Sequence, residues 1–547
     1  MPVGTNYEAD YVIVGAGSAG CVLAERLSAS GAEVVLLEAG GKDTNPFIHV
    51  PAGVLKLVTH PVVNWNYYTE PDEKTGGRAL HCPRGKVLGG SSSINGMLFI
   101  RGHAADYDNW AQMGARGWSY EDVLPHFKSI ERYGPGDPGE RGKSGPIQVE
   151  DYRTVLPLTD RFVEAAQQAG HPFARDLSAR PPAEGVGYSQ MSRNGRFRAS
   201  TARTFLRRAR GRANLRIETG AYATGLLFDG KRCTGVAFRQ HGKDRRATAA
   251  REVIVSGGAV NAPHLLHISG IGPADRLREV GIEVRHDLPG VGANYSDHYT
   301  VRISHRVRGQ QSINQLGRGW RLAREMVRFA LFGNGALTFG VSSAQCYTRS
   351  RDGLASPDIQ LLFTPASFAE DNLRHLEREP GMSVAVSIAR PSSRGEIMAV
   401  SADPFERPAI RPNFLDDPDD MRVALEGIRQ TREILAQPAF QGISQGEVSP
   451  GPEVQDGEAL ESFVRQTGRT IYHMAGTCRM GEDPMAVVDS RLRVHGLEGL
   501  RVIDASVMPA VTTANTNAPT IMIAEKGAGM ILEDNRQDGG REEPVDN

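Results

Sequence analysis

The chain has 547 residues, of which 63 are basic and 64 acidic, so its formal net charge is −1 at neutral pH. That length exceeds what one hydrophobic core usually supports, and we expect two lobes with room for a large ligand. The balanced charge excludes a global electrostatic surface for nucleic acid or an anionic membrane, which leaves small neutral molecules as the default partners.

The cysteines are few, odd in number and never paired as C-x-x-C: Cys21, Cys82, Cys233, Cys346 and Cys478. Such a set favours neither a disulfide framework nor a zinc site, and it fits a reducing compartment. Residues 1–8 lack the layout of a signal peptide, and no apolar stretch approaches the roughly 18 residues that a membrane span needs. We therefore expect a cytoplasmic protein with no metal and no integral membrane span.

The N-terminal region predicts a βαβ unit. An apolar run at 10–14 enters a glycine-rich turn at 15–20, and helical spacing continues over 21–28. A second apolar run, 33–37, ends at Glu38. Strand, turn, helix, second strand and acid occur in the order of a dinucleotide-binding fingerprint.

Each glycine of that turn has a physical role. Gly15 permits the tight turn, Gly17 lets the backbone approach a pyrophosphate, and Gly20 lets the helix pack on the strand. The helix N-terminus then offers free N–H groups to phosphate. Because Glu38 would bind ribose hydroxyls and repel a 2′-phosphate, the unit favours FAD or NAD over NADP.

A second glycine-rich stretch occupies residues 83–97 and packs small residues and donors into one loop-to-helix passage. Such a passage can bring many backbone N–H groups against a phosphate or a flavin ring. Taken alone, it is equally well explained as a tight turn between domains.

Later segments indicate two kinds of sheet. Strand-like runs at 253–258 and 500–504 resemble those of the N-terminal unit, so we expect them in one nucleotide-binding sheet that is discontinuous in sequence. Alternating runs such as 358–363 and 383–388 favour an antiparallel sheet with helices on one side. Residues 416–435 repeat apolar side chains at helical spacing after an acidic start, which predicts a core helix.

Two segments carry no predicted chemistry. Residues 133–146 are rich in glycine, proline and charge, and we interpret them as a surface loop. Residues 535–547 are polar and charged, and we expect a disordered tail there.

Near the C-terminus, His473 lies in a small-residue turn within the run 472–480, and Asn515 opens the run 515–520. An isolated histidine is more often a hydrogen-bonded structural residue than a catalytic one. In this chain a possible acid/base pair occurs together with a redox cofactor site. The surrounding motif decides whether His473 is structural or catalytic.

Residues 85–102 resemble the first signature of the glucose–methanol–choline oxidoreductase family, and residues 258–272 are similar to its second. The second departs slightly, because Ala262 precedes Pro263 where members usually have Ser or Thr. The other runs that match in order are 64–71, the H-x-x-G-T-C-x-M run from His473, and 502–509. Together they cover about 7–532, so chance agreement is excluded.

The resemblance implies an α/β fold in which a Rossmann-like FAD-binding domain is interleaved with a substrate domain built on an antiparallel sheet. The FAD-binding domain is assigned to 1–160, 201–298 and 464–534, the substrate domain to 161–200 and 299–463, and the tail to 535–547.

The resemblance also implies catalytic roles. His473 matches the family histidine that faces the flavin N5, where a neutral imidazole accepts the alcohol proton while hydride leaves the same carbon. Asn515 matches a position that is His or Asn in the family, and as Asn it can orient the substrate oxygen but not titrate. Tyr472 matches an aromatic position that lines the substrate cavity.

The residues that the fingerprint and the resemblance assign to FAD are Gly15, Gly17, Ser18, Gly20, Glu38, Trp65, Arg84, Val87, Gly90, Asn95, Gly96, Met97, Ala223, Asp504, Ala505 and Asn517. For Asp504 the alternative is a strand-end residue that caps the next turn. Some family members attach FAD covalently through a histidine where this chain has Ile94, so we expect non-covalent FAD. We expect five other histidines to be structural or surface residues: His81, His103, His264, His267 and His298.

These observations predict FAD-dependent oxidation of a primary alcohol, aliphatic or aromatic, to its aldehyde. Reduced flavin would pass its electrons to oxygen or to a quinone-like or protein carrier, with a dehydrogenase favoured. Four alternatives stay open: a hydroxynitrile-lyase-like enzyme, a choline-dehydrogenase-like enzyme, a flavin-binding protein without turnover, and an NAD-dependent dehydrogenase. A choline-like substrate would require an acidic or aromatic cage.

Overall fold

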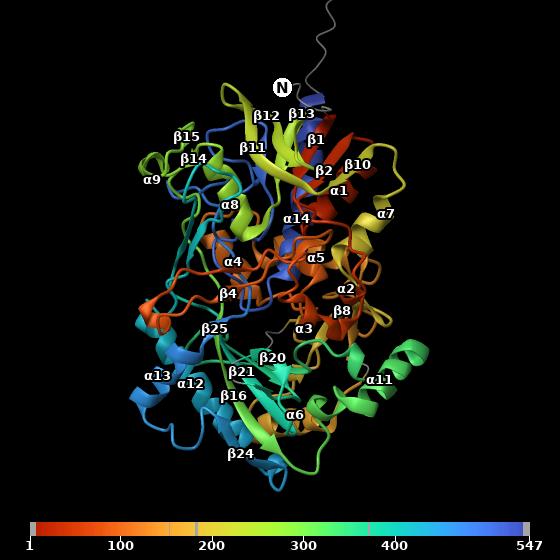
Figure 1. Cartoon of the computed structure of the whole chain (residues 1–547), viewed down its shortest axis with the longest axis vertical. Helices are drawn as coiled ribbons and strands as arrows, with labels where there is room; N and C mark the ends of the chain where they lie inside the picture. Colours follow the sequence, from red (N-terminus) through yellow and green to blue (C-terminus); the bar gives the residue numbers. More distant parts are fainter. Residues whose placement is uncertain (1–6, 153, 181–183, 370–371, 540–547) are drawn as a thin grey trace, which may run out of the picture.

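The computed structural model describes residues 7–152, 154–180, 184–369 and 372–539. Two seven-stranded sheets lie toward opposite ends of its long axis, with helices and long connections between and around them (Figure 1). One sheet is mixed and contains the N-terminal strand, and the other is antiparallel. The predicted α/β class with a second, antiparallel sheet is therefore confirmed.

The mixed sheet is assembled from distant parts of the chain. Its parallel strands are β10 (Leu215–Thr219), β2 (Val34–Glu38), β1 (Tyr7–Val14), β13 (Lys243–Val255) and β26 (Leu500–Val502). Two antiparallel strands, β12 (Arg232–Gln240) and β11 (Ala221–Asp229), extend it beyond β13. The runs predicted at 253–258 and 500–504 thus share a sheet with the N-terminal unit.

The turn from β1 into α1 (Gly20–Ala29) depends on glycine. Gly15 has a φ of +99°, a conformation that other residues rarely adopt. A Cβ on Gly20 would lie 1.8 Å from the carbonyl oxygen of Gly15, so no side chain fits there. Because β1 and β2 are buried, the helix packs directly on the sheet and its N-terminus points past the ends of the strands.

The antiparallel sheet has the order β24 (Ser444–Ser449), β16 (Tyr299–Val307), β21 (Gly381–Ile388), β18 (Ile359–Thr364), β17 (Ala344–Thr348) and β7 (Gly185–Tyr188). The helices α6 (Pro157–Gln168) and α12 (Pro418–Leu435) pack against it and against each other. The short strand β25 (Arg469–Thr470) also pairs with β16, although the domain boundary is predicted at 463/464. That boundary stays a prediction.

The C-terminal helix α14 (Asn517–Gly539) packs against α1 and α5 (Tyr120–Ile130). Its last turns are fixed by ion pairs, since Asp534 lies 2.7 Å from both Arg491 and Arg501. The prediction of a disordered tail from Asn535 is therefore wrong for residues 535–539, and 540–547 lie outside the described residues. In the described ranges, neither α14 nor any other helix is long and apolar enough to cross a membrane.

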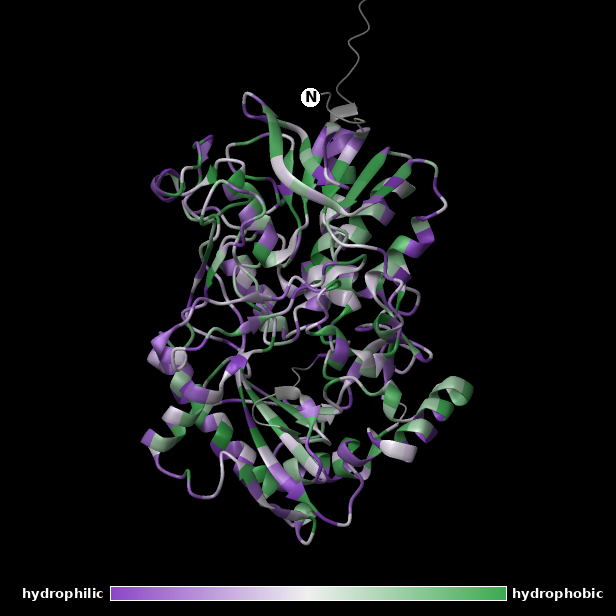
Figure 2. Ribbon diagram, in the orientation of Figure 1, coloured by the Kyte–Doolittle hydropathy of each residue, from purple (hydrophilic) through white to green (hydrophobic). Residues whose placement is uncertain are grey.

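One helix, α11 (Gly319–Phe332), projects from the body beside the antiparallel sheet (Figure 1) and carries apolar side chains along its length (Figure 2). Its exposed large apolar residues are Trp320, Met326, Val327, Leu331 and Phe332. Glu325 alone is buried, and it accepts the Ala336 N–H at 2.8 Å. Arg196 also holds α11, because it donates to the backbone carbonyls of Phe329 and Ala330.

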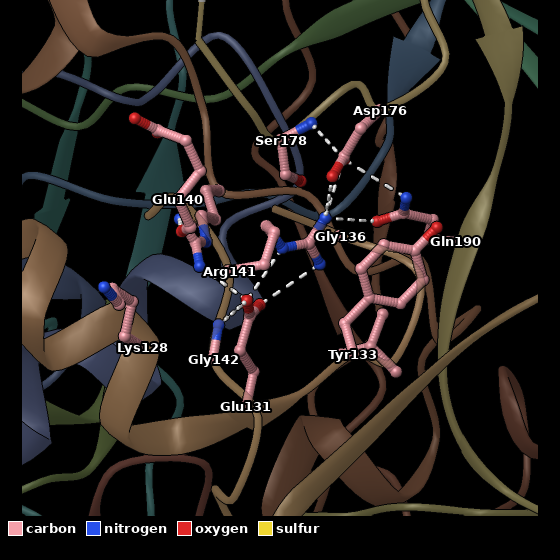
Figure 3. Close-up of polar contacts among 12 residues, drawn as sticks. Lys128, Glu131, Tyr133, Gly136, Glu140, Arg141, Gly142, Asp176, Ser178 and Gln190 are labelled. Atoms are coloured by element: carbon pink, nitrogen blue, oxygen red, sulfur yellow. Dashed lines mark hydrogen bonds and ion pairs between the residues drawn. The ribbon is translucent and has the colours of Figure 1, made fainter. Parts of the chain in front are cut away.

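Residues 133–146 form the predicted surface loop, and a buried ionic cluster anchors it to the body (Figure 3). Arg141 is fully buried and lies 2.7 Å from Glu131 and 2.6 Å from Asp176. Arg101, also buried, lies 2.5 Å from Glu131, and the Arg141 guanidinium lies over the Tyr133 ring. Among the charged residues of the loop, Arg141 is thus buried, whereas Asp137 and Lys143 are exposed.

Replacing Arg141 with methionine leaves the carboxylates of Glu131 and Asp176 buried without their shared partner. Such a loss costs about 3–5 kcal/mol of unfolding free energy. Denaturant unfolding of Arg141→Met should show that decrease, whereas Arg180→Met, which removes an exposed pair with Glu140, should cost about 0–1 kcal/mol. Equal effects of the two variants would contradict the structural role of the cluster.

Candidate active site

A cavity of about 1010 Å³ runs from the mixed sheet to the antiparallel sheet. At one end its lining comes from the turn after β1 and from Glu38 at the end of β2. The glycine-rich stretch 83–97 lines its middle, and the cavity face of β16, β18 and β21 lines the other end. One continuous space thus joins the predicted cofactor site to the second sheet.

Two glycines allow the walls of the cofactor end to meet. Gly90 has a φ of +51°, and a Cβ on it would lie 2.6 Å from the Cα of Gly17. The two glycine-rich segments therefore touch through their backbones. A Cβ on Gly17 itself would enter open space, so this glycine leaves room against the start of α1 that a pyrophosphate can fill. Nearby, the Ser18 hydroxyl donates to Asn517 at 2.8 Å, which ties this turn to α14.

Glu38 lies on the cavity wall and is already hydrogen-bonded. Its carboxylate accepts the N–H of Ala16 at 2.9 Å and of Gly40 at 2.8 Å. Burial raises the pKa of Glu38 to about 7, against the lowering effect of those N–H groups. A carboxylate has lone pairs beyond these two contacts, so the acid can also accept ribose hydroxyls.

The structure brings most of the predicted site residues to this one cavity. Those that line it are Gly15, Gly17, Ser18, Glu38, Trp65, Arg84, Gly90, Asn95, Gly96, Met97, Ala223, Tyr472, His473, Asp504, Ala505, Asn515 and Asn517. Gly20 and Val87 do not line it. Gly20 is needed for the packing of α1 on the turn, and Val87 is buried in an apolar cluster with Ile48, Leu57, Val63 and Ile94.

Asp504 has the capping role and also lines the cavity, and its contact with FAD stays a prediction. Its side chain accepts the Ser506 N–H at 2.7 Å and caps the short helix η7 (Ala505–Val507). It also accepts the Gly258 N–H at 2.7 Å and lines the cavity. The residue thus joins the ends of β13 and β26, where the cofactor end of the cavity forms.

His473 is nearly buried, with 8% of its surface exposed, and both ring nitrogens have partners. Its Nε2 lies 2.9 Å from the Nδ2 of Asn515, and its Nδ1 lies 2.8 Å from the Nδ1 of His298. Because Asn515 Nδ2 can only donate, His473 Nε2 is the acceptor and its proton resides on Nδ1. The imidazole is therefore a neutral tautomer whose Nε2 lone pair accepts an N–H of Asn515 on the cavity wall.

The buried carboxylate of Asp297 fixes the backbone of His473. Asp297 accepts the backbone N–H of His473 and that of His298, each at 2.8 Å, through the same oxygen. Its other oxygen accepts the hydroxyls of Tyr295, at 3.0 Å, and Thr470. Burial raises the pKa of Asp297 to about 6, and the N–H and hydroxyl donors and Arg84 oppose that rise.

The electrostatics of the pair keep both imidazoles neutral. Burial, with His298 and Arg84 nearby, holds the pKa of His473 well below its usual range. Burial also lowers the pKa of His298 to about 4, although the carbonyls of Thr512 and Ala389 oppose this. A depressed histidine pKa means that the neutral form persists as the pH falls below 6.5.

Sequence reasoning did not identify His298 or Asp297 as functional. His298 was expected to be structural or superficial, and the structure places it in direct contact with the proposed base. The contact joins residues 175 positions apart, from the start of β16 to the turn after β25. The adjacent Asp-His pair at 297–298 was the available signal, but no local spacing connects it to residue 473.

Comparison with known proteins identifies the family. The N-terminal and C-terminal GMC oxidoreductase models match residues 9–300 and 391–524. The oxygen-dependent choline dehydrogenase of Photobacterium profundum is 42% identical over 96% of this chain and 93% of its own length. The enzyme of the same name from Brucella canis is 41% identical, over 96% of each chain.

Solved structures agree with that match. Pyridoxine 4-oxidase from Mesorbium loti superposes with a TM-score of 0.86 at 30% identity, over 96% of this chain and 99% of that one. Formate oxidase of Aspergillus oryzae RIB40, whose FAD modification has been studied, gives a TM-score of 0.90 at 26% identity, over 97% and 99%. The open cradle at Gly17 and the single long cavity fit the FAD that such enzymes bind. The chain belongs to the glucose–methanol–choline oxidoreductase family, the FAD-dependent enzymes that act on CH–OH groups.

Proposed function

We propose that this enzyme oxidises a primary alcohol, aliphatic or aromatic, to the aldehyde, with His473 as the base and Asn515 as the orienting donor. The observation that carries the proposal is the neutral His473 ring, whose unprotonated Nε2 and the amide of Asn515 meet on the cavity wall. FAD, when bound, supplies the acceptor of the hydride.

Asn515 and His473 have different roles toward the substrate hydroxyl. A hydroxyl placed between them can accept from Asn515 Nδ2 and donate to His473 Nε2, replacing their direct contact of 2.9 Å. Taking the proton onto Nε2 leaves the Nδ1 hydrogen bond to His298 intact, so the ring need not turn during the transfer. An oxygen that loses its proton in this way makes the adjacent carbon a far better hydride donor.

The names of the relatives raise choline as a second candidate substrate. The described carboxylates of the lining are Glu38, Glu377 and Asp504, and each already has hydrogen-bonding or ionic partners. A cationic ligand favours acidic or aromatic cages. The described lining also contains aromatic residues, namely Trp65, Tyr222, Phe339, Phe368, Phe463 and Tyr472, so choline stays an alternative substrate.

One experiment on the holoenzyme distinguishes an oxidoreductase from a lyase and also identifies the kind of electron acceptor. Anaerobic mixing with alcohols bleaches the flavin of an oxidoreductase and leaves the flavin of a hydroxynitrile-lyase-like enzyme yellow. Admitting oxygen afterwards times the reoxidation. A fast return of colour indicates an oxidase, as the names of the relatives suggest, and a slow return indicates a quinone-like or protein carrier.

Replacing His473 with alanine should lower the anaerobic rate of flavin bleaching by roughly 10²–10⁴, the usual contribution of a positioned proton acceptor. Stopped-flow absorbance at saturating alcohol measures this rate. His241→Ala, at an exposed turn outside the cavity, is the matched control and should bleach like the wild type. A His473→Ala variant that bleaches at the control rate would refute the assignment of the base.

We further propose that FAD is held without a covalent bond, because Ile94 is buried and has no nucleophilic atom at the position where some members carry the linking histidine. Precipitating the holoenzyme with acid should release the yellow colour into the supernatant, and the pellet should be colourless. Colour that stays with the washed pellet would overturn this proposal.

A further inference from the structure

The strand β16 presents alternate residues to the substrate end of the cavity. Thr300, Arg302 and Ser304 lie two positions apart and all line it, as expected for one face of a strand. Across the sheet, Arg302 is paired with Ala385, which belongs to an apolar cluster with Leu362 and others. Arg302 thus lines the cavity between two hydroxyl-bearing residues and beside an apolar cluster.

Arg302 has no charged partner of opposite sign among the described residues. Its Nη1 is buried and makes no hydrogen bond, and its guanidinium stacks 4.6 Å from the ring of Phe368. The charged group that faces it is Arg469 on β25, which adjoins β16. Burial and then Arg469 lower the pKa of Arg302 to about 10, so the side chain is still cationic at neutral pH.

A buried cation without a counter-ion is costly, and proteins normally pair it. None of the described carboxylates of the cavity is the counter-ion of Arg302. Glu38 and Asp504 accept backbone N–H groups, and Glu377 pairs with Arg306 at 2.9 Å. The other arginines differ from Arg302: Arg84 donates to Tyr472 and Arg78 to Gly468, both through backbone carbonyls. Arg302 also lines the cavity, but its Nη1 makes no hydrogen bond with any described residue.

We propose that Arg302 binds an anionic group of the substrate, so that the preferred alcohol carries a carboxylate at the end remote from its hydroxyl. The inference rests on the proposed function of the same cavity and names the class of alcohol. A substrate carboxylate would give this guanidinium the anionic partner that the described residues do not supply, through a charge-assisted hydrogen bond.

The strand also sets the length of this substrate. Arg302 lies four residues beyond His298, and a strand rises about 3.3 Å per residue, so their Cα atoms are roughly 13 Å apart. His298 contacts the base directly, and the arginine side chain can span part of the interval. The carboxylate is thus separated from the carbinol carbon by a spacer such as a benzene ring or a short alkyl chain.

The experiment compares each acid with its neutral amide on the holoenzyme. The pairs are 4-(hydroxymethyl)benzoate with 4-(hydroxymethyl)benzamide, and 6-hydroxyhexanoate with 6-hydroxyhexanamide, with benzyl alcohol and choline as references. In the wild type, the anaerobic bleaching rate divided by the half-saturating concentration should be roughly 10- to 100-fold higher for the acid, the worth of a charge-assisted hydrogen bond. Choline should be the poorest substrate of the set.

Arg302→Met should abolish the preference for the acid while benzyl alcohol still bleaches the flavin, which shows that the variant is folded. Arg302→Lys should retain part of the preference, because it retains the charge. Arg246→Met removes an exposed arginine of the mixed sheet and should behave like the wild type. An unchanged preference for the acid in Arg302→Met, or choline as the best wild-type substrate, would overturn the inference.

A second measurement does not depend on turnover. Calorimetric titration with 4-methylbenzoate and 4-methylbenzamide, neither of which has a hydroxyl to oxidise, should show tighter binding of the anion to the wild type and equal binding to Arg302→Met. If no alcohol bleaches the wild type, the proposed function fails, and this titration still decides the role of Arg302. Equal binding of the two ligands to the wild type would contradict that role.

Discussion

The active site depends on one buried carboxylate, that of Asp297, which receives the backbone N–H groups of both His298 and His473. This oxygen joins the start of β16 to the turn after β25, two segments far apart in sequence. The same two segments are also joined by backbone hydrogen bonds between Ser296 and Ala475 and between Ile471 and His298. Because the donors are backbone groups, the rings are free to face each other and the cavity.

The tautomer of His473 and its charge have different physical causes. Hydrogen bonds to His298 and Asn515 set the tautomer of His473, and burial sets its charge. At the cofactor end the cavity is shaped by glycine backbones and helix α1. At the substrate end it is shaped by side chains of an antiparallel sheet. The proposed chemistry lies where the two ends meet, and residues next to both sheets contribute to the lining.

The sequence predicted the parts of this structure that local chemistry determines. The unit from β1 to Glu38 was located to within a few residues, because the strand, glycine turn and helix are specified by consecutive residues. The placement of His473 and Asn515 beside each other followed from the resemblance rather than from periodicity. Both side chains lie on the cavity wall, 2.9 Å apart between their nitrogens.

Other features depend on tertiary pairing that no local pattern encodes. His298 and Arg302 acquire their importance from the register of β16 against its neighbours, which decides the face that each side chain occupies. Arg141 was assigned to a surface loop because charge normally indicates solvent, but Glu131 and Asp176 bury it. Residues 535–539 continue α14 for the same reason, since Asp534 is fixed by arginines from another segment.

The most direct test of the central claim is the protonation state of His473, measured by nitrogen-15 NMR of histidine-labelled protein, with its signals assigned by comparison with His473→Gln. The structure predicts a neutral ring protonated on Nδ1, with Nε2 unprotonated, throughout the range from pH 8 to pH 6, because burial depresses its pKa. Titration with an ordinary midpoint near 6.5, or a proton on Nε2 at neutral pH, would contradict the account.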